Sequence, residues 1–142
     1  MSQCWTDKFV GLPYAEFGRA REDGCDCWGL AKVIYQEELG ISLPDYLGYS
    51  SIEEHGELAA VIAGAVVSPL WVPVVGKAIA FDIAVFRRGR LDTHVGIVVR
   101  HGLMIHIARD DSAKIESYRA GSWSHRLTDH YRHVEMVSRA VR

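Results

Sequence analysis

The stretch Gly24-Cys25-Asp26-Cys27-Trp28-Gly29-Leu30 combines the start of a helix with a reactive side chain. Asp26 is typical of a helix N-cap, because its short carboxylate accepts the free backbone N–H groups of the first turn. Apolar residues then recur at helical spacing after Cys27, and Gly40 is typical of a residue that ends a helix. The pattern predicts a helix from about Cys27 to Gly40 whose first turn carries a thiol.

The cysteines allow two interpretations of Cys27. The first turn of a helix favours negative charge, because its N–H groups are unsatisfied and the helix dipole is positive there, so a thiol at this place becomes more acidic. A buried, unreactive cysteine fits the same turn equally well. The other two cysteines are Cys4 and Cys25. An odd total and a pair separated by one residue do not fit a disulfide framework.

The histidines favour the reactive interpretation. His94 stands at the beginning of one predicted strand, 95–99, directly before its first residue. His106 lies near the end of the next predicted strand, 103–107. Their separation is even, so a symmetric turn between the strands places both rings on one face of the sheet. With a thiol at the start of a facing helix, the rings would supply a base and an orienting group. The remaining histidines are interpreted as ordinary surface residues: His55, His101, His125, His130 and His133.

The rest of the pattern predicts helices first and strands afterwards. A short helix is expected after Thr6, and a second one from Ser50 or Ser51, which both begin S-x-x-E capping boxes, to about residue 68. Besides those at 95–99 and 103–107, strands are expected at 81–86, 115–118 and 131–137. This order indicates an α+β fold with N-terminal helices packed on a small antiparallel sheet. No repeat or linker interrupts the chain, so a single domain over residues 1–142 is expected.

Composition excludes several classes of partner. The chain has 142 residues, 49% apolar and 24% charged, with a formal net charge of −2. This is typical of one domain with a hydrophobic core, and the charge argues against a nucleic-acid partner. The longest apolar run, 58–67, is shorter than the about 20 residues that span a membrane. The first residues lack a basic segment followed by an apolar one, so we expect synthesis in the cytoplasm without a secretory signal.

Several segments together resemble the NlpC/P60 family of cell-wall cysteine peptidases. The family pattern reads roughly Y…G-x-D-C-x-G-L, G-D-L-x-x-F, H-V-G-I and M-I-H-A. The matching segments come in the same order and span about residues 10–108; they are Tyr14, 24–30, Phe81–Phe86, Thr93–Val98 and Met104-Ile105-His106. The variant Asp-Cys-Trp-Gly-Leu is similar to the branch found in tailed-phage and gene-transfer-agent gene clusters.

The resemblance implies a papain-like α+β fold and a role for each matched residue. Cys27 would be the nucleophile, His94 the general base and acid, and His106 the residue that orients His94. Tyr14 and the backbone N–H of Cys27 would stabilise the oxyanion. The resemblance implies no cofactor and no metal ion.

Two departures from the pattern concern substrate binding and the fold. Trp28 stands where many members carry Ser, and in some of these that Ser and the preceding Asp, here Asp26, help to hold the free amino end of the peptide. Trp28 is interpreted either as an aromatic wall of the site or as a core residue. Phe81 replaces the usual Gly before Asp82, which predicts a modified strand start.

The function implied is hydrolysis of peptidoglycan peptide stems, at the bond between γ-linked D-glutamate and the diamino acid. The implied partners are those stems and a protein of a phage-like tail or baseplate that carries the enzyme to the wall. Three alternatives stay open. One is a zinc site of Cys25, Cys27, His94 and His106, although a C-x-C pair matches zinc-site spacing poorly. The others are an inactive structural protein of the tail tip, and an amidase or acyltransferase on the same scaffold.

Overall fold

The computed structural model describes residues 4–16, 18–43, 70–88, 91–109 and 111–141. Their largest element is a six-stranded sheet whose neighbouring strands are all antiparallel. In spatial order, its strands are β3 (Trp71–Pro73), β8 (Leu127–His133), β4 (Ile83–Arg88), β5 (Leu91–Arg100), β6 (Leu103–His106) and β7 (Lys114–Ser117). The strands predicted at 81–86, 95–99, 103–107 and 115–118 are therefore confirmed, the last as the edge strand β7.

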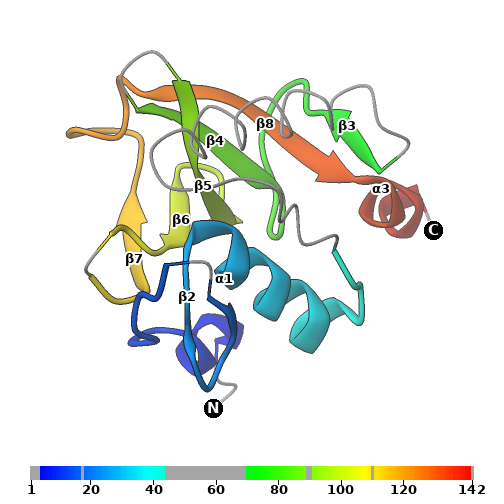
Figure 1. Ribbon diagram of the computed structural model, residues 1–142. Coiled ribbons are helices and arrows are strands. Elements are labelled where there is room, and N and C mark those ends of the chain that lie inside the picture. The colour runs from blue at the N-terminus through cyan, green and yellow to red at the C-terminus, as the bar shows by residue number, and fades with distance from the viewer. Residues whose placement is uncertain (1–3, 17, 44–69, 89–90, 110, 142) are drawn as a thin grey trace.

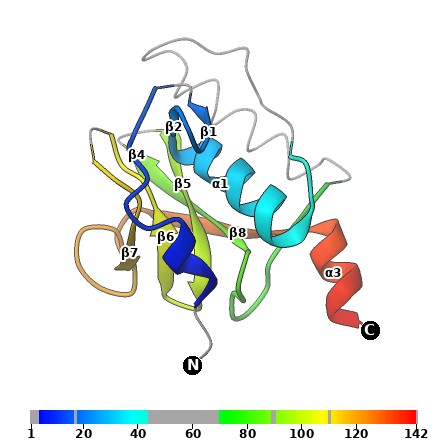
Figure 2. The same ribbon diagram turned by 90° about the horizontal axis from the view of Figure 1, so that it is seen from below.

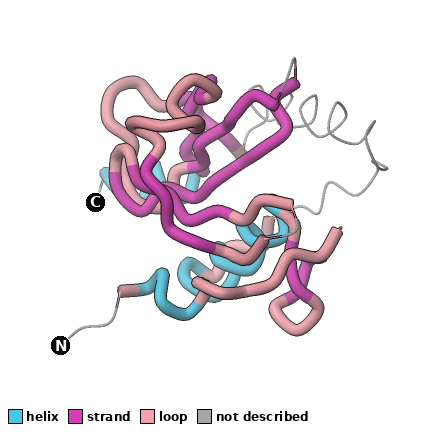
Figure 3. The backbone as a smooth tube through the Cα atoms, turned by 90° about the vertical axis from the view of Figure 1, so that its left-hand side faces the viewer, coloured by secondary structure: helices cyan, strands magenta, loops and turns pink. Residues whose placement is uncertain are grey.

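The N-terminal part of the chain lies on one side of this sheet (Figures 1 and 3). It contains a 3₁₀ turn, η1 (Trp5–Lys8), a short hairpin of β1 (Arg19–Ala20) and β2 (Gly24–Cys25), and helix α1 (Cys27–Ile34). The helix continues as a π-helical turn, η2 (Tyr35–Leu39), and ends at Gly40, whose φ of 67° lies in the left-handed region. The predicted helix from Cys27 to Gly40 is confirmed.

The sheet is buried on both faces because apolar residues occupy both sets of alternating positions on its central strands. Towards α1 the core contains Leu30, Ile34, Tyr35, Ile83, Val85, Val95, Ile97 and Ile105. A second cluster on the other face contains Ala84, Phe86, Val98, Met104 and Tyr118. Helix α1 packs against β5, the strand that carries His94. Figure 2 shows this arrangement from below.

The expectation of several N-terminal helices on a small sheet is wrong. The sheet is the larger part, and in the described residues α1 is the one N-terminal α-helix packed on it. The helix predicted from residue 50 or 51 to about 68 lies outside the described residues. No helix in the described part of the chain is long and apolar enough to cross a membrane.

The strand predicted at 131–137 is also wrong in its second half. Strand β8 ends at His133, and helix α3 (Val134–Val141) begins immediately after it. His133 is buried, and its Nδ1 accepts a hydrogen bond from the Glu135 backbone N–H at 3.1 Å, which satisfies one free donor of the first turn. The interpretation of His133 as a surface residue is corrected by the same observation.

Candidate active site

Cys27 is the first residue of α1, where the sequence placed it. Asp26 is the N-cap, and its Oδ1 accepts a hydrogen bond from the Gly29 backbone N–H at 2.7 Å. The Cys27 side chain is partly exposed, whereas the thiol of Cys25 is fully buried. A partly exposed thiol at a capped helix N-terminus is the environment in which cysteine nucleophiles occur.

His94 and His106 form a hydrogen-bonded pair on neighbouring strands. Their Nε2 and Nδ1 atoms, respectively, are 2.8 Å apart, and the side chains are 2% and 0% exposed. The prediction that both rings leave the sheet on one face is therefore confirmed. Gly96 makes room for this pair, because a Cβ at position 96 would lie 2.5 Å from Met104 Sδ and 3.4 Å from His106 Cβ.

The hydrogen-bonded pair continues to a carboxylate that sequence reasoning missed. His106 Nε2 lies 2.8 Å from Glu116 Oε1, on the edge strand β7. Met104 is paired with Glu116 across β6 and β7, so Glu116 and His106 are diagonal neighbours on the same face. The sequence did predict an edge strand at 115–118, which contains Glu116. Because side chains alternate between the two faces of a strand, Glu116 could be placed beside His106 only once the strand register was known.

An aromatic ring, also missed, covers the histidine pair. Trp123 stacks on His94 with ring centroids 4.6 Å apart and meets His106 edge-on at 5.1 Å. The guanidinium of Arg126 lies 5.3 Å from the Trp123 centroid on the tryptophan ring. Trp123 belongs to the turn between β7 and β8, and nothing in its local sequence pattern indicates this contact.

Backbone hydrogen bonds bring Tyr14 and the start of α1 to the end of β6. Residues 11–15 pair on one side with the loop after β6, through Tyr14 N–H to the Asp111 carbonyl at 3.1 Å. On the other side they pair with β2, through Cys25 N–H to the Pro13 carbonyl at 3.0 Å. Burial raises the pKa of Tyr14, and the charges of Asp26 and Cys27 raise it further. The Tyr14 hydroxyl therefore keeps its proton and can donate a hydrogen bond beside Cys27.

Two of the residues predicted for substrate binding are engaged elsewhere. Trp28 is 2% exposed and meets Trp71 edge-on at a centroid distance of 6.2 Å, so it is a core residue and not the wall of an open site. The carboxylate of Asp26 caps α1 and also accepts a hydrogen bond from Arg19 Nη1 at 2.6 Å. These contacts give Asp26 a role in holding the start of the helix.

The zinc alternative finds no support in the geometry. Among the residues that the structure describes, no three His, Cys, Asp or Glu side chains are grouped so that they could hold a metal ion. The thiol of Cys25 lies 3.7 Å from the Ala20 carbonyl oxygen, within the β1–β2 hairpin. Burial raises the pKa of Cys25 to about 11, which keeps this thiol protonated at neutral pH.

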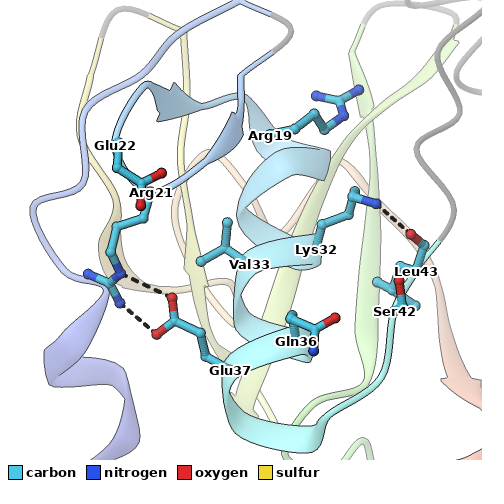
Figure 4. A pocket seen from close by; sticks show the side chains of 9 residues that line it. All are labelled: Arg19, Arg21, Glu22, Lys32, Val33, Gln36, Glu37, Ser42 and Leu43. Carbon is cyan, nitrogen blue, oxygen red and sulfur yellow. Dashed lines mark hydrogen bonds and ion pairs between the residues drawn. The ribbon is translucent and has the colours of Figure 1, made fainter.

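A pocket of about 250 Å³ lies on the outer face of α1, beside the β1–β2 hairpin (Figure 4). Several of its charged lining residues are engaged with neighbours: Arg21 forms two hydrogen bonds of 3.0 Å to Glu37, and Lys32 donates to the Leu43 carbonyl. Arg19 connects the pocket to the helix cap through Asp26. The pocket is thus a neighbour of the Cys27 site and contains none of the histidines described above.

Comparison with known proteins decides the family. A model of the NlpC/P60 family matches residues 11–132. The chain belongs to the NlpC/P60 family. The matched region includes Cys27, the histidine pair and Glu116, and ends just before the last residue of β8.

Two curated relatives of this NlpC/P60 chain come from Bacillus subtilis. A gamma-DL-glutamyl hydrolase is 26% identical over 122 residues, which are 86% of this chain and 26% of the relative. A bifunctional muramidase/DL-endopeptidase, CwlT, is 29% identical over 123 residues, covering 84% of this chain and 32% of the relative. The chain thus spans about a quarter to a third of the length of these relatives.

Solved structures show the same fold. The NlpC/P60 domain of the peptidoglycan hydrolase SagA superposes with a TM-score of 0.58 at 19% identity, covering 89% of this chain and 91% of that domain. An NlpC/P60 family protein from Bacillus cereus superposes with a TM-score of 0.64 at 22% identity, covering 87% of this chain and 36% of the other. At these identities the likeness concerns the fold.

Proposed function

We propose that this NlpC/P60 chain is a cysteine peptidase that hydrolyses the peptide stems of peptidoglycan. The observation that carries the proposal is the hydrogen-bonded pair His94–His106 on β5 and β6, together with a helix packed against β5 whose first residue is Cys27. A thiol, an imidazole and a residue that orients the imidazole are the groups that cysteine-dependent acyl transfer requires. The names of the two curated relatives, a glutamyl hydrolase and a DL-endopeptidase, agree with this chemistry.

The proposed mechanism uses the second ring nitrogen of His94, Nδ1. His94 Nε2 faces His106, so Nδ1 takes the proton of the Cys27 thiol, and we expect Cys27 Sγ within about 4 Å of Nδ1. The sulfur attacks the amide carbon and forms a C–S bond, while Tyr14 and the Cys27 backbone N–H stabilise the oxyanion. The C–N bond then breaks, and His94 gives its proton to the leaving amine. Water hydrolyses the thioester and releases the free acid.

The finer part of the proposal is the bond that is cleaved. We place it between γ-linked D-glutamate and the diamino acid. The support is the agreement between the family pattern around Cys27 and the printed names of the relatives. Trp28 lies in the core and has no hydroxyl, so we propose that this chain holds the amino end of the peptide differently from members with Ser at this position.

We also propose that the protein is carried by a phage-like tail and acts on the wall after delivery. The support is the Asp-Cys-Trp-Gly-Leu variant at positions 26–30, which resembles the phage and gene-transfer-agent branch. Immunodetection of the protein in purified particles tests this part, and its absence from such particles contradicts it.

Incubation of the purified protein with muropeptides, followed by mass spectrometry of the products, tests the activity. We expect fragments that end in D-glutamate, and no fragments with the Cys27→Ala or His94→Ala variant. His106→Ala is expected to retain a small residual rate, because an orienting residue costs less than the nucleophile. Release of intact stems would indicate an amidase instead, and full activity of Cys27→Ala would overturn the proposal.

A further inference from the structure

We infer that Glu116 is a positioning residue for the Cys27 site: its carboxylate holds the proton of His106 on Nε2, and so keeps the lone pair of His94 on Nδ1, where it can act as the base. The inference rests on the proposed function, because it concerns the protonation of the same two histidines. It adds a residue from the edge strand β7 that no family motif quoted above contains.

The geometry places three groups in one hydrogen-bonded row. Glu116 Oε1 is 2.8 Å from His106 Nε2, and His106 Nδ1 is 2.8 Å from His94 Nε2. The middle ring is completely buried, whereas the Glu116 side chain is 36% exposed. Both nitrogens of His106 thus have hydrogen-bond partners, and the ring itself is shielded from water.

The carboxylate determines which nitrogen of each histidine ring carries a hydrogen. An ionised carboxylate only accepts hydrogen bonds, so His106 Nε2 must carry a hydrogen. A neutral imidazole carries one hydrogen, so His106 Nδ1 is an acceptor and His94 Nε2 is the donor. Neutral His94 therefore has its lone pair on Nδ1. Without a carboxylate at position 116, no group in this row keeps the His106 hydrogen on Nε2. If that hydrogen moved to Nδ1 of His106, His94 Nε2 would have to accept it, and the His94 hydrogen would lie on Nδ1.

The charged groups around His106 agree with a neutral ring. They come from β7 and the loop before it: Glu116, Lys114 and Asp111. Burial lowers the pKa of His106, and the hydrogen bond that His106 donates to Glu116 offsets this only in part. Lys114 Nζ is 3.0 Å from Asp111 and 3.9 Å from Glu116, so the lysine is shared between the two carboxylates. His106 is consequently neutral at pH 7, as the proton assignment requires.

Glu116→Gln tests the inference, because the amide keeps the size of the side chain and removes its charge. Glu135→Gln is the matched control: Glu135 is an exposed carboxylate on α3, paired with Arg139 at 3.9 Å. The first readout is the ¹⁵N chemical shifts of the histidine rings in labelled protein, which report the tautomers without any substrate. The second is kcat and KM on a muropeptide, with the thermal midpoint recorded for each variant.

In the wild type we expect His94 and His106 both with hydrogen on Nε2. In Glu116→Gln we expect part or all of His106 with hydrogen on Nδ1, and a kcat about 10- to 100-fold lower with little change in KM. Glu135→Gln should match the wild type in both readouts. A wild-type His106 with its hydrogen on Nδ1, an unchanged tautomer in Glu116→Gln, or an unchanged kcat in that variant would each overturn the inference.

The two readouts separate this inference from the proposed function. A wild-type protein that cleaves no muropeptide contradicts the proposed function, and the ¹⁵N shifts then still decide whether Glu116 sets the tautomer. A wild-type protein that cleaves muropeptides equally well with Gln at position 116 supports the function and overturns the role of Glu116.

Discussion

At the residue scale, the three cysteines occupy three different environments. Cys4 is exposed, Cys25 is buried with a pKa of about 11, and Cys27 is partly exposed in the first turn of α1. A helix N-terminus and a neighbouring imidazolium both stabilise a thiolate. Reactivity is therefore expected to differ between side chains that are chemically identical in the unfolded chain.

Limiting iodoacetamide at about pH 6, well below the ordinary cysteine pKa of roughly 8.5, should label Cys27 first. Activity should fall in proportion to the label, and His94→Ala should slow the labelling because the imidazole that accepts the thiol proton is lost. Peptide mapping by mass spectrometry measures the site, and a Cys4→Ser variant removes the exposed background thiol. Labelling of Cys4 or Cys25 first, with activity retained, would show that Cys27 is not an activated nucleophile.

Phe81 shows how a departure from a motif is accommodated. Its φ of 74° lies in the left-handed region, which favours the glycine that the family pattern has at this position. The phenyl ring stacks on Trp5 at 4.6 Å, and the Tyr35 hydroxyl donates to the Phe81 carbonyl. Packing thus holds a strained backbone just before β4, which begins at Ile83.

At the scale of elements, a buried ion pair ties the start of β4 to β8. Asp82 is 1% exposed, and it accepts two hydrogen bonds of 2.8 Å from Arg132, at Nε and Nη2. Asp82 Oδ2 also accepts the Ile79 backbone N–H at 2.9 Å. The pair joins the start of β4 to β8, two strands that lie far apart in the sequence. In the sheet, β4 is the direct neighbour of β5, the strand that carries His94.

Asp82→Asn should destabilise the protein, because it leaves the Arg132 guanidinium without its carboxylate. Removing one partner of a buried pair costs about 3–5 kcal/mol, and the 21% exposure of Arg132 reduces this to roughly 2–3 kcal/mol. Urea unfolding measures the free energy. The exposed Glu135–Arg139 pair is the control, since Glu135→Gln should cost less than about 0.5 kcal/mol. A loss below about 1 kcal/mol for Asp82→Asn would contradict this account.

At the scale of the whole molecule, partly and fully buried histidines connect folding to pH. Burial is the main cause that lowers the pKa of His106, His130 and His133 below the ordinary value of 6.5. They lie on β6 and β8, and His130 also bonds the Tyr118 hydroxyl at 2.9 Å. Folding therefore favours the neutral ring at each of these positions.

The stability of the fold should be constant above about pH 7 and should fall as the pH decreases through 6.5. In that range the unfolded chain binds protons that the folded histidines do not bind, so protonation favours unfolding. Urea midpoints at pH 7.5 and pH 5.5 measure the effect. His133→Gln should make the dependence shallower, whereas His125→Gln, at an exposed position, should leave it unchanged. A midpoint that rises towards pH 5.5 would contradict the assignment of neutral buried rings.

Much of the site could be predicted because its signals are local. The N-cap Asp26, the thiol in the first turn and the even spacing of His94 and His106 all depend on helix and strand periodicity within short segments. The same periodicity predicted β4, β5, β6 and the edge strand β7. The family pattern added Tyr14, which backbone hydrogen bonds place beside Cys25, two residues before α1.

Only the tertiary structure decided the surroundings of these residues. Local pattern does not say which strand lies beside which, so the order β3-β8-β4-β5-β6-β7 and the contacts of Glu116 and Trp123 with the histidines were not predictable. Burial is also a property of distant contacts, and it placed Trp28 in the core. The sequence by itself indicated the candidate catalytic groups, because helix caps and strand alternation depend on a few neighbouring residues. The contacts that hold these groups in place come from segments that meet only when the chain folds.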